Sequence, residues 1–244
     1  SLAIVKDQTS ASLGTGSATV ATGAAAITAT SGLSSLVKAD GEAGGEDAAI
    51  GAAVAIAIFE PTTTATVDRN LTAASVTISA TSSSASLVES KAAASGSDSS
   101  DDDADTTSES TVQDNPNSSG QTSSVPNAND QTSQSSSTSS SQSGQGNSGV
   151  GVAAAIAINV VTAVNTASVG ANRAITGTSG AVIVRATNAT DGIAKATGTS
   201  MKDSASANIG AAVGFNYADV DNLATVGANA VLTGVGVTVE AVTP

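Results

Sequence analysis

The sequence predicts an all-β protein: a parallel β-helix, or β-solenoid, built from four tandem repeats of about 55 residues with one long low-complexity loop. Three observations lead to this fold class. One unit recurs four times, its elements alternate apolar with small or polar residues, and aromatic residues make up only 1% of the 244 residues. A globular core of this length would ordinarily hold more aromatic rings, because each ring buries a large area.

Two short patterns mark the unit. The first begins at positions 10, 64, 166 and 223, where the chain reads Ser10–Leu13, Thr64–Val67, Thr166–Val169 and Leu223–Val226. The second follows each copy, as Ala25–Ala29, Val76–Ala80, Val182–Ala186 and Val237–Ala241. The intervals lie in the mid-fifties except between the second and third copies, which an insertion separates. A fixed period is the signature of a repeat fold.

Two further patterns complete the unit. One precedes the others, as Val54–Ile58, Ile156–Val160 and Val213–Tyr217, with a shortened first copy at Leu2–Ile4. The other comes last, as Leu36–Ala39, Leu87–Ser90 and Ile193–Ala196. These elements alternate with period two and favour Val, Ile and Thr, which is typical of strands. We therefore expect four short strands per unit.

The length of the unit bears on how the chain coils. We expect about two coils of roughly 20-odd residues per unit, because a narrow β-helix coil is shorter than the unit. Four units would then give ~8 coils and a rod of ~38 Å, at about 4.8 Å per strand. The rival architecture is an array of antiparallel β-sandwiches. Immunoglobulin-like modules, however, carry a buried Trp or a Tyr corner in a unit of about 100 residues.

A turn column recurs in each unit directly after the first pattern. Val169–Asn172 and Val226–Asn229 are near copies, and the matching places hold Asp68 with Asn70, and Gly14 with Gly16. Asn and Gly both reach the left-handed backbone region at low cost. The column therefore predicts a corner with positive φ, either as a generic turn or as a stacked ladder of Asn side chains inside a coil.

The chain divides into solenoid repeats one and two at 1–94, an insertion loop at 95–148, and repeats three and four at 149–244. The loop is rich in Ser and Asp, and its apolar residues are Ala104, Val112, Val125 and Ala128. Such a segment buries too little apolar surface to offset its ordering entropy. The same junction in other units spans 40–47 and 198–208, so one corner of the fold accepts insertions.

Composition excludes several kinds of function. The chain has no Cys and no His, which excludes disulfides, Cys or His metal sites, thiol nucleophiles and imidazole bases. A net charge of −13 together with almost no aromatic rings disfavours binding to nucleic acid, and the same negative charge disfavours docking on anionic lipid. No apolar run is long enough for membrane insertion. The start at Ser1, without Met or a signal segment, suggests a processed piece of a longer chain.

Candidate chemistry is sparse, and we assign no catalytic, cofactor-binding or metal residues. The sharpest feature is an acidic run: Asp98, Asp101, Asp102, Asp103, Asp105, Glu109 and Asp114. Ca²⁺ binding there is a weak alternative to a solvated linker, because no known calcium-loop spacing is present. A smaller oxygen cluster, formed by Asp219, Asp221 and Asn222 beside Tyr217, is interpreted as a turn.

Enzymatic and ice-binding solenoids are the disfavoured readings. Glycoside cleavage needs two facing carboxylates, but the candidates are scattered over the units: Glu60, Asp68, Glu89, Asp191 and Asp219. Thr62, Thr63, Thr64 and Thr66 suggest a Thr face, yet the array is not maintained at 162–166 or 220–223. The basic residues are also scattered, and we interpret the matching Lys38 and Lys195, with Lys91 nearby, as a solvated face or a lateral contact.

The unit reads G-A-A-V-A-I-A-I at Gly51–Ile58, T-A-T-V at Thr64–Val67, G-A-N at Gly227–Asn229 and V-T-V-x-A at Val237–Ala241. This resembles the repeats of large secreted bacterial β-solenoid proteins, the filamentous-haemagglutinin-like and leukotoxin-like filamentous adhesins, over nearly all the chain except 95–148. The resemblance implies a structural segment or subunit of an extracellular or cell-surface filament that adheres or scaffolds, and implies no enzyme. The apparent lack of end caps predicts end-to-end self-association. The alternative is an adhesin module that binds a cell-surface glycan or protein.

Overall fold

The computed structural model describes residues 1–45, 48–95, 133–141, 150–201 and 207–243. These residues contain strands and no helix, and they form three parallel sheets. Sheet A holds β1 (Leu2–Leu13), β4 (Ala48–Val67), β8 (Val150–Val169) and β11 (Ala207–Val226). Sheet B holds β2 (Thr19–Val20), β5 (Leu71–Ala73), β9 (Ala174–Gly177) and β12 (Val231–Thr233). Sheet C holds β3 (Ala25–Gly44), β6 (Val76–Ser95), β10 (Val182–Met201), β13 (Val237–Val242) and β7 (Ser133–Ser141).

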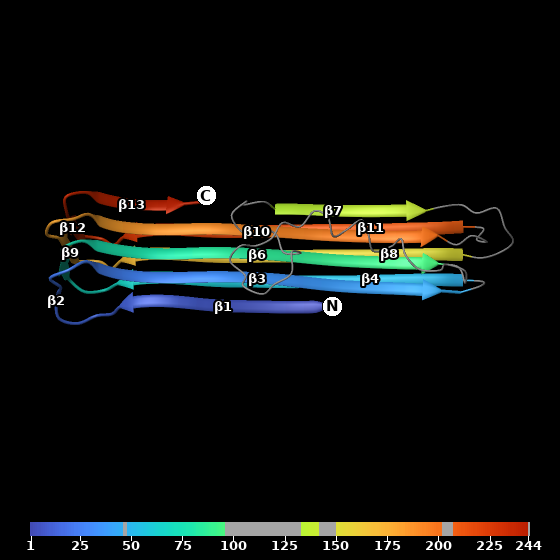
Figure 1. Cartoon of the computed structure of the whole chain (residues 1–244), viewed down its shortest axis with the longest axis horizontal. Coiled ribbons are helices and arrows are strands. Elements are labelled where there is room, and N and C mark those ends of the chain that lie inside the picture. Colours follow the sequence, from blue (N-terminus) through green and yellow to red (C-terminus); the bar gives the residue numbers. More distant parts are fainter. Residues whose placement is uncertain (46–47, 96–132, 142–149, 202–206, 244) are drawn as a thin grey trace.

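The described chain is a parallel β-solenoid, as the sequence predicts. The path runs along a sheet A strand, turns through a short sheet B strand and returns along a sheet C strand (Figure 1). Equivalent residues of successive units lie side by side. Leu2 pairs with Ile56, Ile56 with Ile158, and Ile158 with Phe215. The four sequence units therefore stack directly, and we call each one a rung.

The expected number of coils is wrong. Each unit makes one coil rather than two, because the neighbours of a strand in each sheet are the same strand of the adjacent units. The 20-residue strands of sheets A and C extend ~66 Å at about 3.3 Å per residue, and four rungs span only ~14 Å between the outermost strands. The described chain is thus a wide, flat plate rather than a narrow rod of ~38 Å.

The expected short strands are also wrong, because they join in pairs. Val54–Ile58 and Thr64–Val67 are both parts of β4, and Ala25–Ala29 and Leu36–Ala39 are both parts of β3. Pro61 lies between the first pair and stays inside β4, where the register with β8 omits Glu60 and Pro61 but resumes at Thr62. A proline has no N–H to donate. The strand continues past Pro61 because the residues before and after it pair with β8.

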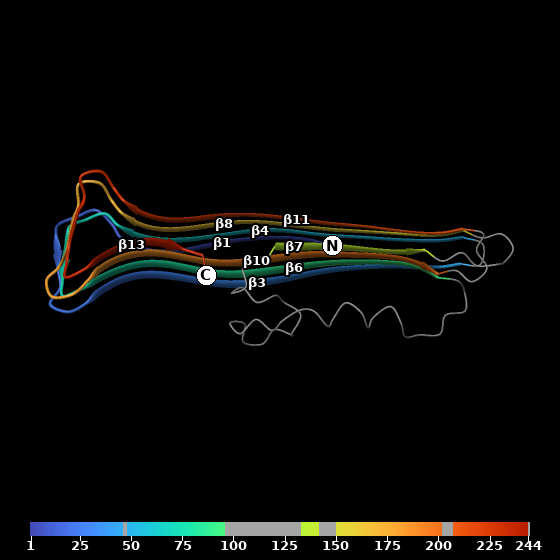
Figure 2. The same cartoon turned by 90° about the horizontal axis from the view of Figure 1, so that it is seen from above.

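The two long sheets form a wedge, and side-chain size follows its width. Near sheet B, where the layers diverge (Figure 2), the core contains large side chains such as Leu71, Ile78 and Ile175. Toward the other end the layers converge, and the core consists almost wholly of alanine with Val37 and Val88. At Gly198 a Cβ would overlap the carbonyl oxygen of Ala211 on the opposite sheet. The narrow interior explains the scarcity of aromatic residues.

The corner between sheets A and B confirms the expected positive φ. Asn172 has φ 59° and Asn229 has φ 56°. Their side chains stack, since Asn229 Nδ2 donates to Asn172 Oδ1 at 3.3 Å, but the pair lies on the exposed outside rather than within the coil. In the second rung the matching Asn70 instead accepts a hydrogen bond from the Ala174 N–H at 2.9 Å.

Replacing Asn172 with alanine is expected to lower the free energy of unfolding by about 1–2 kcal/mol, because a Cβ-bearing residue without a local polar side chain disfavours the left-handed region. Asn172→Gly also removes the side-chain contact but tolerates this φ. Chemical denaturation of both variants separates the backbone effect from the side-chain effect. Equal losses in the two variants would show that φ does not control stability at this corner.

The sheet C strands β3, β6 and β10 end, and the sheet A strands β4, β8 and β11 begin, at the narrow end of the plate (Figure 1), as expected if one corner of the fold accepts insertions. The expectation of a loop without strands over 95–148 is wrong for Ser95, which ends β6, and for the nine residues 133–141. Ser133–Ser141 forms β7 and pairs in parallel with Gly192–Ser200 of β10. Backbone pairing with an edge strand needs no apolar side chain, so composition alone did not reveal this strand.

Candidate interaction surfaces: the open edges and the outer faces

The plate has two open edges in the described part of the chain. One is formed by β1, β2 and β3, and the other by β11, β12 and β13, with β7 continuing the line of β13 (Figure 1). Each edge strand has a neighbour on one side only. Such strands present unpaired N–H and C=O groups that can pair with another strand. The described chain can therefore accept further rungs at both edges.

The direction of the free backbone groups on β11 follows from its pairing. Gly227 N donates to Val169 O at 2.8 Å, as Gly170 N donates to Val67 O in the rung before. Backbone groups of successive strand residues point to opposite sides, and the register of β11 with β8 is continuous. Val226 and every second residue before it, including Ala218, therefore point their backbone groups toward the open edge.

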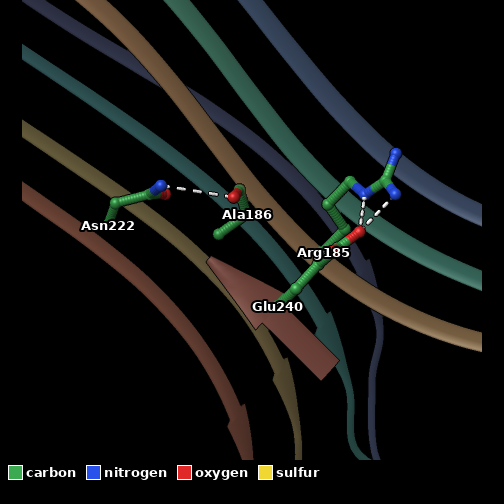
Figure 3. Close-up of polar contacts among 4 residues, drawn as sticks. All are labelled: Arg185, Ala186, Asn222 and Glu240. Carbon is green, nitrogen blue, oxygen red and sulfur yellow. Dashed lines mark hydrogen bonds and ion pairs between the residues drawn. The ribbon is translucent and has the colours of Figure 1, made fainter. Parts of the chain in front are cut away.

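Two ladders of asparagine run through the interior toward this edge. Asn159 Nδ2 donates to Asn216 Oδ1 at 2.9 Å, and Asn165 Nδ2 donates to Asn222 Oδ1 at 3.1 Å. Asn222 in turn donates to the carbonyl of Ala186 (Figure 3) and to that of Val242. The interior amides thus tie sheet A to sheet C across adjacent rungs.

Sequence reasoning missed these interior ladders, although their signal is present. Asn159 and Asn165 are fully buried, and each pairs in register with the asparagine of the next rung. The recurrence of Asn at the same inward position of successive units marks such a ladder. In a narrow parallel interior, equivalent amides lie about one strand spacing apart and can hydrogen-bond along the stack.

Ion pairs link neighbouring rungs on the outer faces. On sheet A, Lys6 Nζ lies 2.6 Å from Glu60 Oε2. On sheet C, Arg185 pairs with Glu240 (Figure 3), and Lys38 Nζ lies 3.2 Å from Glu89 Oε2. The Glu89 side chain is only 7% exposed, so this part of sheet C is not the solvated face that the sequence suggested. The matching Lys195 stands in register with Glu89, which gives a column of alternating charge.

The structure corrects the interpretation of Asp219, Asp221 and Asn222 as a turn. All three lie within β11, where Asp219 and Asp221 lie on the outer face beyond Tyr217 and Asn222 points inward. A shallow surface depression of about 520 Å³ lies on the first two rungs of the same sheet, lined by Lys6, Gln8, Glu60 and Thr62, and does not include these carboxylates. The alternation of strand residues, rather than a loop, brings the two carboxylates to one side.

The other candidate carboxylates are distributed over different parts of the plate. Glu60 and Asp219 lie on the outer face of sheet A, Glu89 and Asp191 belong to sheet C, and Asp68 lies at the corner beside Gly170. Thr62 stands in a column with Gln8, Val164 and Asp221. Only the second rung therefore has Thr in this column, and the Thr array does not continue through the stack. The acidic run 98–114 lies outside the described residues.

Among the described residues there is no group of three or more metal-ligating acidic side chains. No described segment forms a helix that is long and apolar enough to cross a membrane.

These features define the protein's class by its fold: a parallel β-solenoid of stacked repeats whose edge strands stay open in the described part. No protein-family model matches this sequence, and comparison with curated proteins and with solved structures gives no significant match.

Proposed function

We propose that the chain is a structural segment of an extracellular β-solenoid filament, in which further rungs continue the plate edge to edge. The observation that carries this proposal is the pair of open edges on a stack whose register repeats without a shift from rung to rung. The resemblance of the repeat unit to large secreted bacterial solenoid proteins supports the extracellular location and the scaffolding or adhesive role.

The two edges are complementary in form. Both present the same three strands in the same order and direction, because all pairing within the sheets is parallel. A copy added in register would place its Leu2 beside Phe215 and its Ala25 beside Val237. This contact is heterologous, so its repetition produces an open filament rather than a closed dimer. Backbone hydrogen bonds along the filament axis would resist extension.

The test is a proline at the open edge. Ala218→Pro removes an N–H that points away from β8, so it blocks edge pairing while keeping the pairing within the chain. We expect the association constant for end-to-end assembly to fall at least about tenfold. The matched control, Ala218→Val, retains the N–H at the same position. Electron microscopy and sedimentation velocity would measure the assembly length, and circular dichroism would verify that both variants fold.

Two results would contradict the proposal. One is that the unsubstituted chain shows only single plates at all concentrations, without elongated assemblies. The other is that Ala218→Pro and Ala218→Val assemble to the same length, which would mean that the elongated species do not form through this edge.

A further inference from the structure

The outer face of sheet A divides into an apolar half and a polar half along its strands. Every outward position in the half toward the narrow end is apolar apart from one tyrosine hydroxyl, and the larger of these side chains are exposed or partly exposed. They are Leu2, Ile4, Ile50, Val54, Ile56, Ile58, Val150, Val152, Ile156, Ile158, Val160, Ile209, Val213, Phe215 and Tyr217, with small columns at Ala52, Ala154 and Ala211 between them. We call this surface the apolar half-face.

The polar half begins at the next column, where Lys6, Glu60 and Asp219 point outward, and continues with Gln8, Thr62 and Asp221. The outer face of sheet C shows no comparable exposed apolar surface among the described residues. Its apolar column, Leu36, Leu87 and Ile193, is largely buried, and the next column, Lys38, Glu89 and Lys195, is charged. The apolar half-face is therefore a distinct feature of sheet A and not a general property of the plate.

The apolar half-face is large for a surface left in water. About twenty outward positions, at roughly 32 Å² of sheet each, give ~640 Å² per copy. Parallel sheets are ordinarily covered on both faces, and exposed patches above a few hundred Å² mark interaction sites. Two such surfaces in contact would bury ~1,300 Å², which lies in the range of specific protein–protein interfaces.

We infer that the apolar half-face binds a second copy of this chain, face to face, across a two-fold axis that runs along the stacking direction of the rungs. The strands of the two copies are then antiparallel, so the two apolar halves overlap. The two polar halves extend to opposite sides. A lateral pair of plates results, with a dry interface between two sheets about 10 Å apart.

Shape and charge favour this arrangement. The Ala52, Ala154 and Ala211 column forms a furrow between ridges of Ile and Val, and the two-fold axis lets the ridges of each copy enter the furrow of the other. The alternative two-fold axis, parallel to the strands, would bury the two polar halves against each other and take the charged side chains of Glu60, Asp219 and Asp221 out of water. Removing charged groups from water costs free energy unless each one is well paired.

The same charges disfavour a lipid surface as the occupant. The border of the apolar half-face contains Glu60, Asp219 and Asp221 against the single cation Lys6, and the whole chain has a net charge of −13. Peripheral membrane surfaces combine apolar residues with Lys and Arg. A second copy does not bring negative charge against these acidic residues, because its own polar half extends in the opposite direction along the strands.

Lateral pairing uses a sheet face, whereas the proposed filament uses strand edges, so the two are tested separately. In the edge-blocked Ala218→Pro background, we expect light scattering to give the mass of a dimer. Adding Ile156→Lys places a charge at the centre of the apolar half-face and should raise the dimer dissociation constant at least 100-fold. The matched control Ser168→Lys adds the same charge to the same face of β8, but in the polar half, and should leave the dimer intact.

A crosslinking experiment tests the geometry. The chain has no Cys, so each introduced thiol is unique. Ala154→Cys lies near the proposed axis and should be joined to its copy by a short thiol-reactive bifunctional crosslinker that spans sheets about 10 Å apart, while Ser168→Cys, ~45 Å along the strand at about 3.3 Å per residue, should not. A monomer at all concentrations in the edge-blocked background would overturn the inference. So would equal dissociation constants for the two Lys variants, equal crosslinking of the two Cys variants, or a monomer that binds phosphatidylcholine vesicles through this face.

Discussion

Replacing Phe59 with alanine is expected to lower the free energy of unfolding by about 3–5 kcal/mol. Phe59 is 1% exposed and is the largest of the fully buried side chains. It points into the plate from β4, which pairs on both sides with other strands of sheet A. The narrow interior cannot collapse onto the space that the ring leaves, because the hydrogen-bonded sheets on both sides hold their spacing. Most of the lost volume therefore remains as a cavity.

Two controls separate burial from ring chemistry. Phe59→Leu keeps much of the volume and should cost clearly less than the alanine variant. Phe215→Ala removes the same ring from an exposed outward position of β11, where the side chain is 51% exposed. Measured by urea denaturation at concentrations low enough to keep copies apart, it should cost less than about 1 kcal/mol. A Phe59→Ala loss no larger than that of Phe59→Leu would show that the interior adjusts to the smaller side chain.

The registration of the units is the part of the fold that the sequence predicts best. Phe215 and Tyr217 align with Ile56 and Ile58 in the sequence, and the structure places them in the same two columns of sheet A. The sequence alignment of the units predicts these columns correctly because a parallel stack gives equivalent residues of each rung the same environment. The same reasoning confirms the left-handed corner at Asn172, where only a few residue types tolerate the backbone conformation.

The number of coils could not be read from the pattern, because alternation carries no information on where a strand ends. The patterns at Val54–Ile58 and Thr64–Val67 suggested two separate strands, whereas β4 continues through both. The short strand Leu71–Ala73 was missed because three residues give no measurable period. Sequence thus specified which residues align between rungs, and only the structure shows how many strands make one turn of the coil.

The interaction surfaces were predictable to different degrees. Open edges follow from the repeat itself, since a stack of equal rungs has two ends. To predict the apolar half-face, one must know that both sides of Val54–Ile58 are apolar and that only one of them faces the core. A near-continuous apolar run is typical of a parallel strand covered on both faces, and in the described chain one of those faces remains uncovered.

Replacing Asn165 with aspartate is expected to lower the free energy of unfolding by about 3–5 kcal/mol at neutral pH. Asn165 is fully buried, and its Nδ2 lies near three acceptors: Ala80 O at 3.1 Å, Thr187 O at 2.8 Å and Asn222 Oδ1 at 3.1 Å. Aspartate has the same shape but no N–H, so an ionised carboxylate would face three oxygens in a water-poor interior.

The pH dependence identifies the cause of that loss. Burial among acceptors would hold the pKa of the introduced carboxyl above its ordinary value. The unfolded chain would then release its proton at lower pH than the folded chain, so the penalty grows as pH rises and disappears below the ordinary carboxyl range. Denaturation of Asn165→Asp and of the unsubstituted chain at several pH values measures this difference.

Two further variants complete the test of the interior ladder. Asn165→Thr places in the third rung the residue that stands in register in the second, Thr63, and should cost only about 1–2 kcal/mol. Asn229→Asp makes the same amide-to-acid change at the exposed corner and should stay within about 0.5 kcal/mol of the unsubstituted chain. If Asn165→Asp were as mild as Asn229→Asp at neutral pH, water would have to reach the interior beside Asn165. The amide ladders would then fill a hydrated seam rather than bind sheet A to sheet C.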